Sequence, residues 1–272
     1  MVVNAERLKV ERLTFGYPGR VVGRDVSFAM AAGEVLCLLG PNGSGKTTLF
    51  RTLLRLLEPH DGAVLVNGAS IADWPRRQLA RVFGYVPQAQ TGTFPFTARE
   101  MVLMGRTAHV GLFASPTAND VRHAEAALDT LGIAHLADRP YPEMSGGERQ
   151  LALVARALAQ EPSILVMDEP TASLDFGNQV RVLAHMQTLA HRGIAVVLST
   201  HDPDQAFLCA DRVALLHDGR LAHLGATADV VTPATLRETY GVDVDVVTLP
   251  RDGRTVRVCV PSLQRGPGAE AR

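Results

Sequence analysis

Apolar residues follow two different patterns along the chain. Short continuous runs stand at residues 35–39, 164–167 and 194–198. A run of this length, rich in Val, Ile and Leu, is typical of a strand that is buried on both faces of a parallel sheet. Between the runs, apolar residues recur every three or four positions, as in helices that cover a sheet. The pattern therefore predicts an α/β domain with a core of mainly parallel strands flanked by helices.

The N-terminal part has a different periodicity. Apolar and polar residues alternate through residues 7–30, which is typical of half-buried antiparallel strands. Residues 61–68 form a strand-like segment that ends in the turn dipeptide Asn67-Gly68. Residues 82–88 form another. We expect an N-terminal antiparallel β subdomain beside the parallel core.

Residues 93–160 lack strand-like runs and show helical signals instead. Thr97 is suited to cap one helix, and Asn119-Asp120 to cap a second helix with one apolar face. A third helix follows Ser145. The apolar face of the second helix consists of Val121, Ala124, Ala127, Leu128 and Leu131. These signals predict an inserted α-helical subdomain.

Several apolar residues of this insertion fall at positions that look exposed. They are Met101, Leu103, Met104, Val110, Leu112 and Phe113. Either they pack inside the subdomain, or they form a docking face for a partner protein. The residue pattern alone leaves both alternatives open.

The C-terminal part continues with shorter elements. Residues 212–216 and 219–224 have the pattern of edge strands, and residues 226–240 have that of a helix. Residues 242–249 and 254–260 predict a short β tail.

These elements predict one large unit and a short extension. The unit spans residues 1–240, with its sheet core in 1–92 and 161–225 and its helical subdomain at about 93–160. The extension spans residues 241–272, and its last residues are rich in Gly, Pro and Ala and are expected to fray.

Composition narrows the class of protein without naming a function. The chain has 272 residues, 20% of them charged, and a formal net charge of −1, so we expect no surface for nucleic acid. No apolar run approaches the roughly 20 residues that span a bilayer, and the N-terminus lacks a signal-peptide core. Cys37, Cys209 and Cys259 stand far apart among apolar residues. This spacing predicts buried free thiols in a reducing cytoplasm, not a metal site.

A glycine-rich stretch directly after the first buried run carries specific chemistry. It has the spacing G-x-x-x-x-G-K-T, with Lys46 and Thr47 at its end. Its backbone N–H groups can face an anion, and the following helix turns its positive end to the same anion. Lys46 suits the β- and γ-phosphates of a nucleotide, and the Thr47 hydroxyl suits Mg²⁺. The candidate phosphate-binding residues are Gly40, Pro41, Asn42, Gly43, Ser44, Gly45, Lys46, Thr47 and Thr48.

Polar residues follow three further strand-like runs. Asp168 and Glu169 end one run, His201 ends another, and Gln88 ends a third. Ligands bind at the carboxyl ends of parallel strands. There Asp168 can hold Mg²⁺, Gln88 can contact a metal-bound water, and Glu169 can polarise a water that attacks the γ-phosphate. His201 is either a helix cap or a contact of the γ-phosphate and the attacking water.

Two other stretches fit a nucleotide site. Ser145-Gly146-Gly147 stands just before a predicted helix and provides a second helix N-terminus suited to anions. Tyr17 lies in the turn-like sequence of residues 16–19. It is either a plain turn residue or an aromatic face that stacks on a base, and its place before the phosphate loop favours stacking.

Taken in order, these motifs resemble the ATP-binding cassette ATPase subunits of ABC transporters. The resemblance covers roughly residues 7–225. Its most specific element is residues 145–150, Ser-Gly-Gly-Glu-Arg-Gln, which are similar to the LSGGQ-type signature of that family. Met144 replaces the usual Leu, and Glu148 a frequent Gln.

The resemblance assigns family roles to the other motifs. Gln88 matches the Q-loop, His201 the switch histidine, and Tyr17 the base-stacking position. Residues 173–175, Ser-Leu-Asp, match the D-loop, which adds Asp175 to the nucleotide-binding set. The implied catalytic residues are Glu169, His201, Lys46 and Gln88, and the implied metal-binding residues are Thr47, Gln88 and Asp168. An active ATPase that uses ATP and Mg²⁺ is therefore implied.

The resemblance also implies partners. In the family, two cassettes pack head to tail, and each ATP lies between the phosphate loop of one copy and Ser145 and Gly147 of the other. A membrane permease docks on the helical subdomain, and a substrate-binding protein takes part indirectly. The cassette is then a peripheral protein on the cytoplasmic face of the inner membrane.

Two segments resemble one branch of the family. Residues 101–113 and 240–244 look like cassettes of metal-chelate importers, which serve ferric siderophores, haem, cobalamin and, in one sub-branch, molybdate or tungstate. This likeness favours docking for Met101, Met104 and Phe113. A soluble ABC ATPase, such as an iron–sulphur assembly factor, and an exporter cassette are the competing interpretations.

Overall fold

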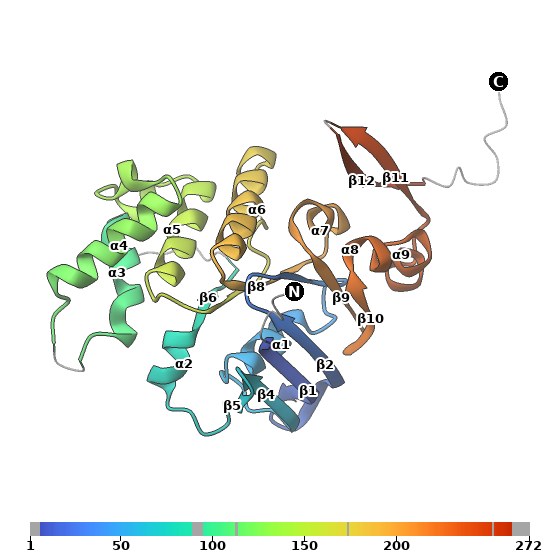
Figure 1. Cartoon of the computed structure of the whole chain (residues 1–272), viewed down its shortest axis with the longest axis horizontal. Helices are drawn as coiled ribbons and strands as arrows, with labels where there is room; N and C mark the ends of the chain where they lie inside the picture. Colours follow the sequence, from blue (N-terminus) through green and yellow to red (C-terminus); the bar gives the residue numbers. More distant parts are fainter. Residues whose placement is uncertain (1–5, 89–94, 112–113, 173, 252, 263–272) are drawn as a thin grey trace.

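The computed structural model describes residues 6–88, 95–111, 114–172, 174–251 and 253–262 of the chain. Figure 1 shows a group of helices at one side, two sheets in the middle, and a C-terminal hairpin that extends away at the other side.

Three expectations concern residues outside these ranges. They are the docking role of Leu112 and Phe113, the D-loop residue Ser173, and the fraying of residues 265–272.

The first sheet is antiparallel, and the N-terminal part of the chain forms it. Its strand order is β2-β1-β4-β5. These strands are β1 (Glu6–Tyr17), β2 (Arg20–Ala31), β4 (Asp61–Val66) and β5 (Ala69–Ser70). β1 and β2 form a long hairpin, and Asn67-Gly68 forms the turn between β4 and β5. The predicted antiparallel subdomain is confirmed.

The second sheet is mainly parallel and has the strand order β10-β9-β3-β8-β7-β6. Its strands are β3 (Val35–Leu39), β6 (Phe83–Val86), β7 (Ile164–Met167), β8 (Ala195–Thr200), β9 (Arg212–His217) and β10 (Arg220–Ala226). All neighbouring pairs are parallel except β9 with β10. The predicted α/β class is confirmed.

One strand prediction was wrong. β9 is not an edge strand, because it pairs with β3 on one side and with β10 on the other. Its residues from Val213 to Leu216 are all buried, whereas β10 alternates between half-buried and exposed residues. An uninterrupted apolar run suits an interior position, and alternation suits the edge.

Both faces of the parallel sheet are covered. All five residues of β3 are buried. Cys37 and Leu39 join an apolar core that includes α6 (Phe176–His191) and α7 (Pro203–Cys209). On the opposite face, Leu36 and Leu38 join a core shared with α1 (Lys46–Leu53) and the antiparallel sheet.

Helix α1, the helix predicted after the phosphate loop, spans eight residues. It ends at Leu53, because Arg55 adopts a left-handed backbone conformation with a φ of 52°. The Arg55 guanidinium donates hydrogen bonds to the carbonyl oxygens of Ile71 and Trp74, which hold the chain in this turn.

The regular elements of the predicted insertion are helices and 3₁₀ turns in its described residues. It contains α3 (Ala98–Leu103), the 3₁₀ turn η1 (Met104–Ala108), α4 (Ala118–Thr130) and α5 (Gly146–Leu158). Two shorter 3₁₀ turns, η2 (Ala134–Leu136) and η3 (Tyr141–Glu143), lie between α4 and α5. Thr97 caps α3 as predicted.

The start of α4 differs from the prediction. Thr117 is the N-cap, and Asp120 completes a capping box with it, so Asn119-Asp120 already lies inside the helix. Thr117 and Asp120 have the spacing of a capping box, in which an acidic side chain at the third helical position accepts a hydrogen bond from the backbone amide of the cap residue. The Asp120 carboxylate also pairs with the buried guanidinium of Arg106 (3.1 Å).

The C-terminal part forms two short helices and a hairpin. Helices α8 (Thr227–Val230) and α9 (Pro233–Tyr240) replace the single predicted helix, because Pro233 follows Thr232, the cap of a new helix. Strands β11 (Val244–Arg251) and β12 (Arg254–Pro261) form the predicted β tail.

One further helix lies earlier in the chain. Helix α2 (Arg76–Val82) comes directly before β6.

The three cysteines are free thiols. Cys37 and Cys209 are buried as predicted, but Cys259 is only half-buried, because it lies on the two-stranded C-terminal hairpin. Within the described residues, no helix combines the length and the apolarity needed to cross a bilayer.

Candidate functional site

Four parallel strands direct their carboxyl ends to one edge of the second sheet. β3 leads into the phosphate loop, β6 leads to Gln88, β7 to Asp168 and Glu169, and β8 to His201. A cavity of about 460 Å³ opens at this edge. Its lining consists of Tyr17, Arg20, Val22, Asn42, Gly43, Gly45, Lys46, Thr47, Thr48, Gln88 and Glu169. The fold therefore brings most of the predicted phosphate-binding residues together with Gln88 and Glu169.

The phosphate loop is shaped by its glycines and by Lys46. Gly45 precedes α1 with a φ of 104°, a conformation open mainly to glycine, and an added Cβ would lie 3.0 Å from a methyl group of Val22. Lys46 begins α1 and is 5% exposed. Its Nζ donates to the carbonyl oxygens of Gly40 (2.7 Å) and Pro41 (3.0 Å). The loop thus holds a buried cation at the positive end of a helix, where anions bind.

Burial lowers the pKa of Lys46, and the nearby carboxylates of Glu169 and Asp168 act in the opposite direction. Glu169 Oε1 lies 3.7 Å from the Lys46 Nζ. The carboxylates therefore offset part of the cost of taking the Lys46 ammonium out of water.

Asp168 and Glu169 are held by one hydroxyl group that the sequence reasoning missed. The buried Ser199 Oγ donates to Asp168 Oδ1 (2.8 Å) and accepts the Glu169 amide N–H (2.9 Å). Ser199 lies in β8, which pairs with β7. This arrangement orients the Asp168 carboxylate and fixes the backbone that carries Glu169.

Glu169 occupies an unusual backbone conformation. Its φ is +46°, in the left-handed region that non-glycine residues rarely adopt. Its Oε1 lies 3.5 Å from His201 Nδ1 as well as 3.7 Å from the Lys46 Nζ. Strain of this kind is concentrated at functional sites, where the surrounding structure holds a side chain in a set direction. Glu169 is thus directed at the centre of the site.

Tyr17 and Gln88 lie at the rim of the cavity. Tyr17 is 39% exposed, and its hydroxyl accepts a hydrogen bond from Arg51 Nη1 (3.3 Å), which anchors the ring to α1. Gln88 is exposed two residues after the end of β6. Both positions leave the side chains accessible to a ligand.

The Ser145-Gly146-Gly147 stretch does not line this cavity. Ser145 caps α5, because its hydroxyl accepts a hydrogen bond from the Glu148 amide (3.3 Å). In return, the Ser145 amide donates a hydrogen bond to the Glu148 carboxylate (2.7 Å). Ser145 is exposed. This second anion-suited helix end is therefore presented outward, apart from the phosphate loop of its own chain.

The start of α6 supports the start of α5. Asp175 caps α6 through the Asn178 amide (2.9 Å) and also accepts from the Asn178 side chain (2.8 Å). A Cβ added to Gly147 would lie 2.3 Å from the Asn178 side chain, so glycine permits close contact between the two helix ends. Asp175, like Ser145, is not part of the cavity lining.

Some residues at the site carried no local sequence signal. Arg20 and Val22 line the cavity because β2 folds back beside the phosphate loop. The buried Gln205 Oε1 accepts hydrogen bonds from Thr171 (2.7 Å) and Thr200 (2.9 Å), which joins the loop after Glu169 to the end of β8. The paired strands β7 and β8 bring these groups together.

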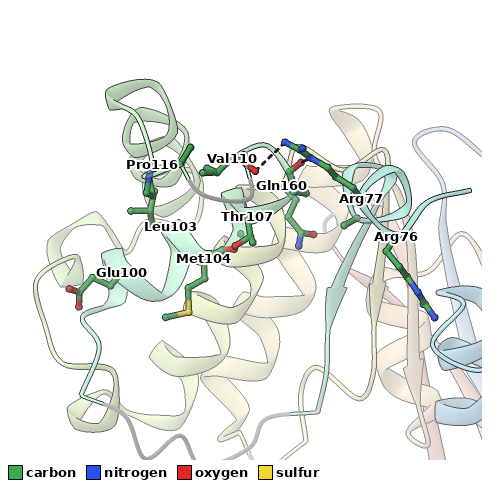
Figure 2. A pocket seen from close by; sticks show the side chains of 14 residues that line it. Arg76, Arg77, Glu100, Leu103, Met104, Thr107, Val110, Pro116 and Gln160 are labelled. Carbon is green, nitrogen blue, oxygen red and sulfur yellow. Dashed lines mark hydrogen bonds between the residues drawn. The ribbon is translucent and has the colours of Figure 1, made fainter.

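A second hollow lies between α2 and the helical insertion. It has a volume of about 710 Å³, and Figure 2 shows Leu103, Met104, Val110 and Pro116 around it. Arg77 of α2 forms one wall and donates to the carbonyl oxygens of Ala108 (2.8 Å) and Val110 (3.1 Å). We call this hollow the α2–η1 groove.

Only some of the apolar residues of the insertion that look exposed in the sequence line the α2–η1 groove. Met104 is 39% exposed and lines the groove together with Leu103 and Val110. Met101 does not line it and packs against the core instead.

A sequence profile of the ABC transporter family matches residues 24–172. The chain belongs to the ABC transporter family. Two relatives with assigned names are similar over most of their length. The hemin import ATP-binding protein HmuV of Gloeobacter violaceus is 42% identical over 90% of this chain and 91% of its own. The iron(3+)-hydroxamate import ATP-binding protein FhuC of Bacillus subtilis is 33% identical over 92% of this chain and 93% of its own.

A solved structure agrees with these relatives. The chain resembles a subunit of a metal-chelate type ABC transporter in an inward-facing conformation, with a TM-score of 0.85 and 32% identity. The match covers 95% of this chain and 98% of that one. The predicted family and fold are confirmed, and the chain is an ATP-binding ABC ATPase of the importer class.

Proposed function

We propose that the chain hydrolyses ATP to energise the import of an iron chelate, either haem or a ferric siderophore, through a membrane permease. The observation that carries the ATPase assignment is the grouping of Lys46, Glu169 and His201 at one edge of the sheet. The iron chelate is supported by the names of the hemin and iron-hydroxamate import relatives. The subunit acts at the cytoplasmic face of the inner membrane.

The binding roles follow from position. The backbone N–H groups of Gly43, Gly45, Lys46, Thr47 and Thr48, in the loop and at the start of α1, bind the phosphates. Lys46 contacts the β- and γ-phosphates. The ring of Tyr17, which is partly exposed and lines the cavity, stacks on the adenine.

The residues present also fit a Mg²⁺ ion. Asp168 offers a buried carboxylate that Ser199 orients, and Thr47 and Gln88 offer a hydroxyl and an amide oxygen. Magnesium prefers oxygen ligands and is usually held by one or two protein groups together with substrate phosphates. When bound, the ion neutralises charge on the phosphates. Among the described residues, no group of three or more His, Cys, Asp or Glu forms a metal cage of its own.

Hydrolysis depends on Glu169 and His201. Glu169 accepts a hydrogen bond from the attacking water and polarises it toward the γ-phosphate. His201, 3.5 Å from Glu169 Oε1, contacts the γ-phosphate and the same water. The strained backbone at Glu169 keeps its carboxylate aimed at that point.

The exposed position of Ser145, outside the cavity of its own chain, supports a shared site. In a head-to-tail pair, the start of α5 with Ser145 and Gly147 of one copy reaches the γ-phosphate that the other copy holds. ATP then joins the two copies, and hydrolysis releases them. Asp175, which caps the helix packed against Gly147, lies beside this contact.

The α2–η1 groove is the proposed docking site for the permease. Its lining is mostly apolar. At one wall, Arg77 links α2 to the helical insertion through its hydrogen bond to the Ala108 carbonyl oxygen. A short apolar helix of the permease fits a groove of this kind. This role assigns Leu103, Met104 and Val110 to docking and leaves Met101 to internal packing.

A charged side chain in the groove should prevent docking of the permease without affecting ATP hydrolysis by the isolated subunit. We expect Met104→Glu to abolish co-purification with the permease and to leave the ATPase rate of the isolated subunit unchanged. Leu56→Glu is the matched control, because Leu56 is also exposed but lies outside the groove. Normal permease capture by Met104→Glu would refute the docking assignment.

Uptake measurements test the function and the substrate together. Cells that lack this chain are complemented with the wild type or with Glu169→Gln and supplied with labelled haem, a ferric hydroxamate, cobalamin or molybdate. We expect the wild type alone to restore uptake of haem or of the ferric hydroxamate. Restored uptake of molybdate or cobalamin would contradict the substrate class, and uptake of any of them by Glu169→Gln would contradict the role of Glu169.

A further inference from the structure

His201 lies in a short connection between β8 and α7, so few contacts set its position. β8 ends at Thr200, and α7 begins two residues after His201. Asp202 caps α7 by accepting a hydrogen bond from the Asp204 amide (2.9 Å), and its own amide donates to the Thr200 hydroxyl (3.1 Å). These contacts fix the residues on either side of His201.

The C-terminal segment contacts His201 itself. Tyr240 is the last residue of α9, and its hydroxyl donates a hydrogen bond to the His201 carbonyl oxygen (3.2 Å). The ring of Tyr240 packs against the larger apolar core. Burial is the main reason that the pKa of Tyr240 lies well above its ordinary value. The hydroxyl therefore stays protonated and remains a donor at neutral pH.

The hairpin is attached to the helix that follows His201. The Cys259 amide in β12 donates to Asp204 Oδ1 (2.7 Å), and β12 packs along α7. Val244, Val246 and Cys259 pack against the same core as Tyr240. The C-terminal segment thus holds the His201 connection at its carbonyl and at the first turn of α7.

Local contacts hold α9 in place against the hairpin. Gly241 ends α9 with a φ of 68°, and Arg237 forms an ion pair with Asp243 across this turn. The Ser262 amide donates to the Asp243 carbonyl oxygen (2.8 Å), which closes the open end of the hairpin. Tyr240 is therefore part of a fixed unit that consists of α9, β11 and β12.

We propose that Tyr240 is a positioning residue for ATP hydrolysis and that α9 and the β11–β12 hairpin hold it against the His201 loop. This inference rests on the proposed function, because Tyr240 acts only through His201. A small displacement of the His201 backbone changes the 3.5 Å contact with Glu169 and so the alignment of the attacking water. Within the described residues, the Tyr240 hydroxyl bonds to the His201 carbonyl oxygen and not to the phosphate loop or Tyr17, so we expect nucleotide affinity to stay the same.

Tyr240→Phe removes the hydroxyl and keeps the ring. We expect the kcat for ATP hydrolysis to fall about three- to tenfold, the effect of one lost hydrogen bond, with KM and the affinity for a fluorescent ATP analogue unchanged. Tyr141→Phe is the matched control, because Tyr141 is also buried but lies in the helical insertion. Its kcat should equal that of the wild type.

A double variant shows whether the effect passes through His201. In a His201→Ala background, Tyr240→Phe should cause no further loss of kcat. A further three- to tenfold loss would overturn the proposal, and so would a wild-type kcat for the single variant Tyr240→Phe.

A second readout does not depend on activity. Hydrogen exchange at the amides of Asp202 and of residues 204–206 should be faster in Tyr240→Phe than in the wild type and unchanged in Tyr141→Phe. Unchanged protection in Tyr240→Phe would also overturn the proposal. If Glu169→Gln abolishes hydrolysis while Tyr240→Phe leaves both kcat and exchange unchanged, the proposed function stands and this inference alone fails.

Discussion

Lys46 is the side chain whose surroundings are most specific to phosphate binding. It is buried, its ammonium group donates to two loop carbonyl oxygens, and Glu169 lies 3.7 Å away. We expect Lys46→Ala to weaken ATP binding about ten- to hundredfold, because a charge-assisted hydrogen bond contributes about 1.5–3 kcal/mol. Titration with a fluorescent nucleotide measures this loss.

Lys9→Ala is the control for that measurement. Lys9 lies on β1, far along the chain from the phosphate loop, and its ammonium pairs with the Glu11 carboxylate (2.8 Å). Equal nucleotide affinity in Lys46→Ala and Lys9→Ala would refute the phosphate-binding role of Lys46.

Ser199 is the residue that joins the two carboxylates. We expect Ser199→Ala to lower the free energy of unfolding by about 1–3 kcal/mol, because the buried Asp168 carboxylate and the Glu169 amide lose their shared partner. The kcat should fall as well, since Glu169 loses its backbone support. Urea unfolding and ATPase kinetics test both effects, with the exposed Ser70→Ala as control. A wild-type kcat in Ser199→Ala would show that the hydroxyl does not align Glu169.

The sequence reveals the residues of contiguous motifs but not those that pairing of distant segments brings in. The phosphate loop, Asp168 and Glu169 could be predicted because strand, turn and ligand-binding residues follow each other directly. Ser199 and Gln205 could not be predicted, because their roles depend on the register of β8 against β7 and on the packing of α7. The sequence likewise predicts only that Tyr240 ends a helix, and the fold brings its hydroxyl to the His201 carbonyl oxygen.

Among the elements, the starts of α5 and α6 pack closely against each other. Gly147 leaves no room for a methyl group beside Asn178, whose side chain is bound to Asp175. We expect Gly147→Ala to destabilise the protein by about 1–3 kcal/mol through overpacking and to lower ATP hydrolysis. The double variant Gly147→Ala/Asn178→Ala should recover stability, as thermal unfolding can show. No recovery would mean that the clash lies elsewhere.

The helical insertion should be sensitive to acid through Asp120. Hydrogen bonds from Thr117, together with Arg106, hold the pKa of Asp120 well below its usual range. The fold therefore favours the ionised carboxylate, and this stabilisation is present above the unfolded pKa of about 3.9 and is lost as the pH falls below it. Urea unfolding of Asp120→Asn should show a deficit at pH 7 that shrinks toward pH 3.

Asp129→Asn is the control for the acid effect, because Asp129 lies exposed on the same helix. A deficit of Asp120→Asn that is the same at pH 7 and at pH 3 would contradict the role of the ionised carboxylate.

Element types could be predicted from the sequence better than their ends and their neighbours. Thr117 rather than Asn119 starts α4, because the capping box with Asp120 satisfies the first amides of the helix. β9 is interior rather than at the edge, and the apolar run in it fits that position only once its two partners are known. Strand neighbours depend on the whole topology, which local periodicity does not contain.

For the whole molecule, the main feature is that the Ser145-Gly146-Gly147 stretch does not line the proposed nucleotide cavity of its own chain. Lys46 and Glu169 line the cavity, while Ser145 and Gly147 of the same chain lie outside it. Two copies arranged head to tail would place Lys46 of one beside Ser145 of the other. Two complete sites then form for each pair of chains, as two-fold symmetry requires.

Mixing two variants tests this shared site most directly. Lys46→Ala and Ser145→Ala should each hydrolyse ATP slowly. In a mixed pair, both changes fall in one site and the other site is intact, so an equimolar mixture should recover up to about a quarter of the wild-type rate. A mixture of Lys46→Ala with the double variant Lys46→Ala/Ser145→Ala should stay inactive. If the first mixture hydrolyses ATP no faster than its two components do separately, Lys46 and Ser145 do not meet across two copies and the shared site is wrong.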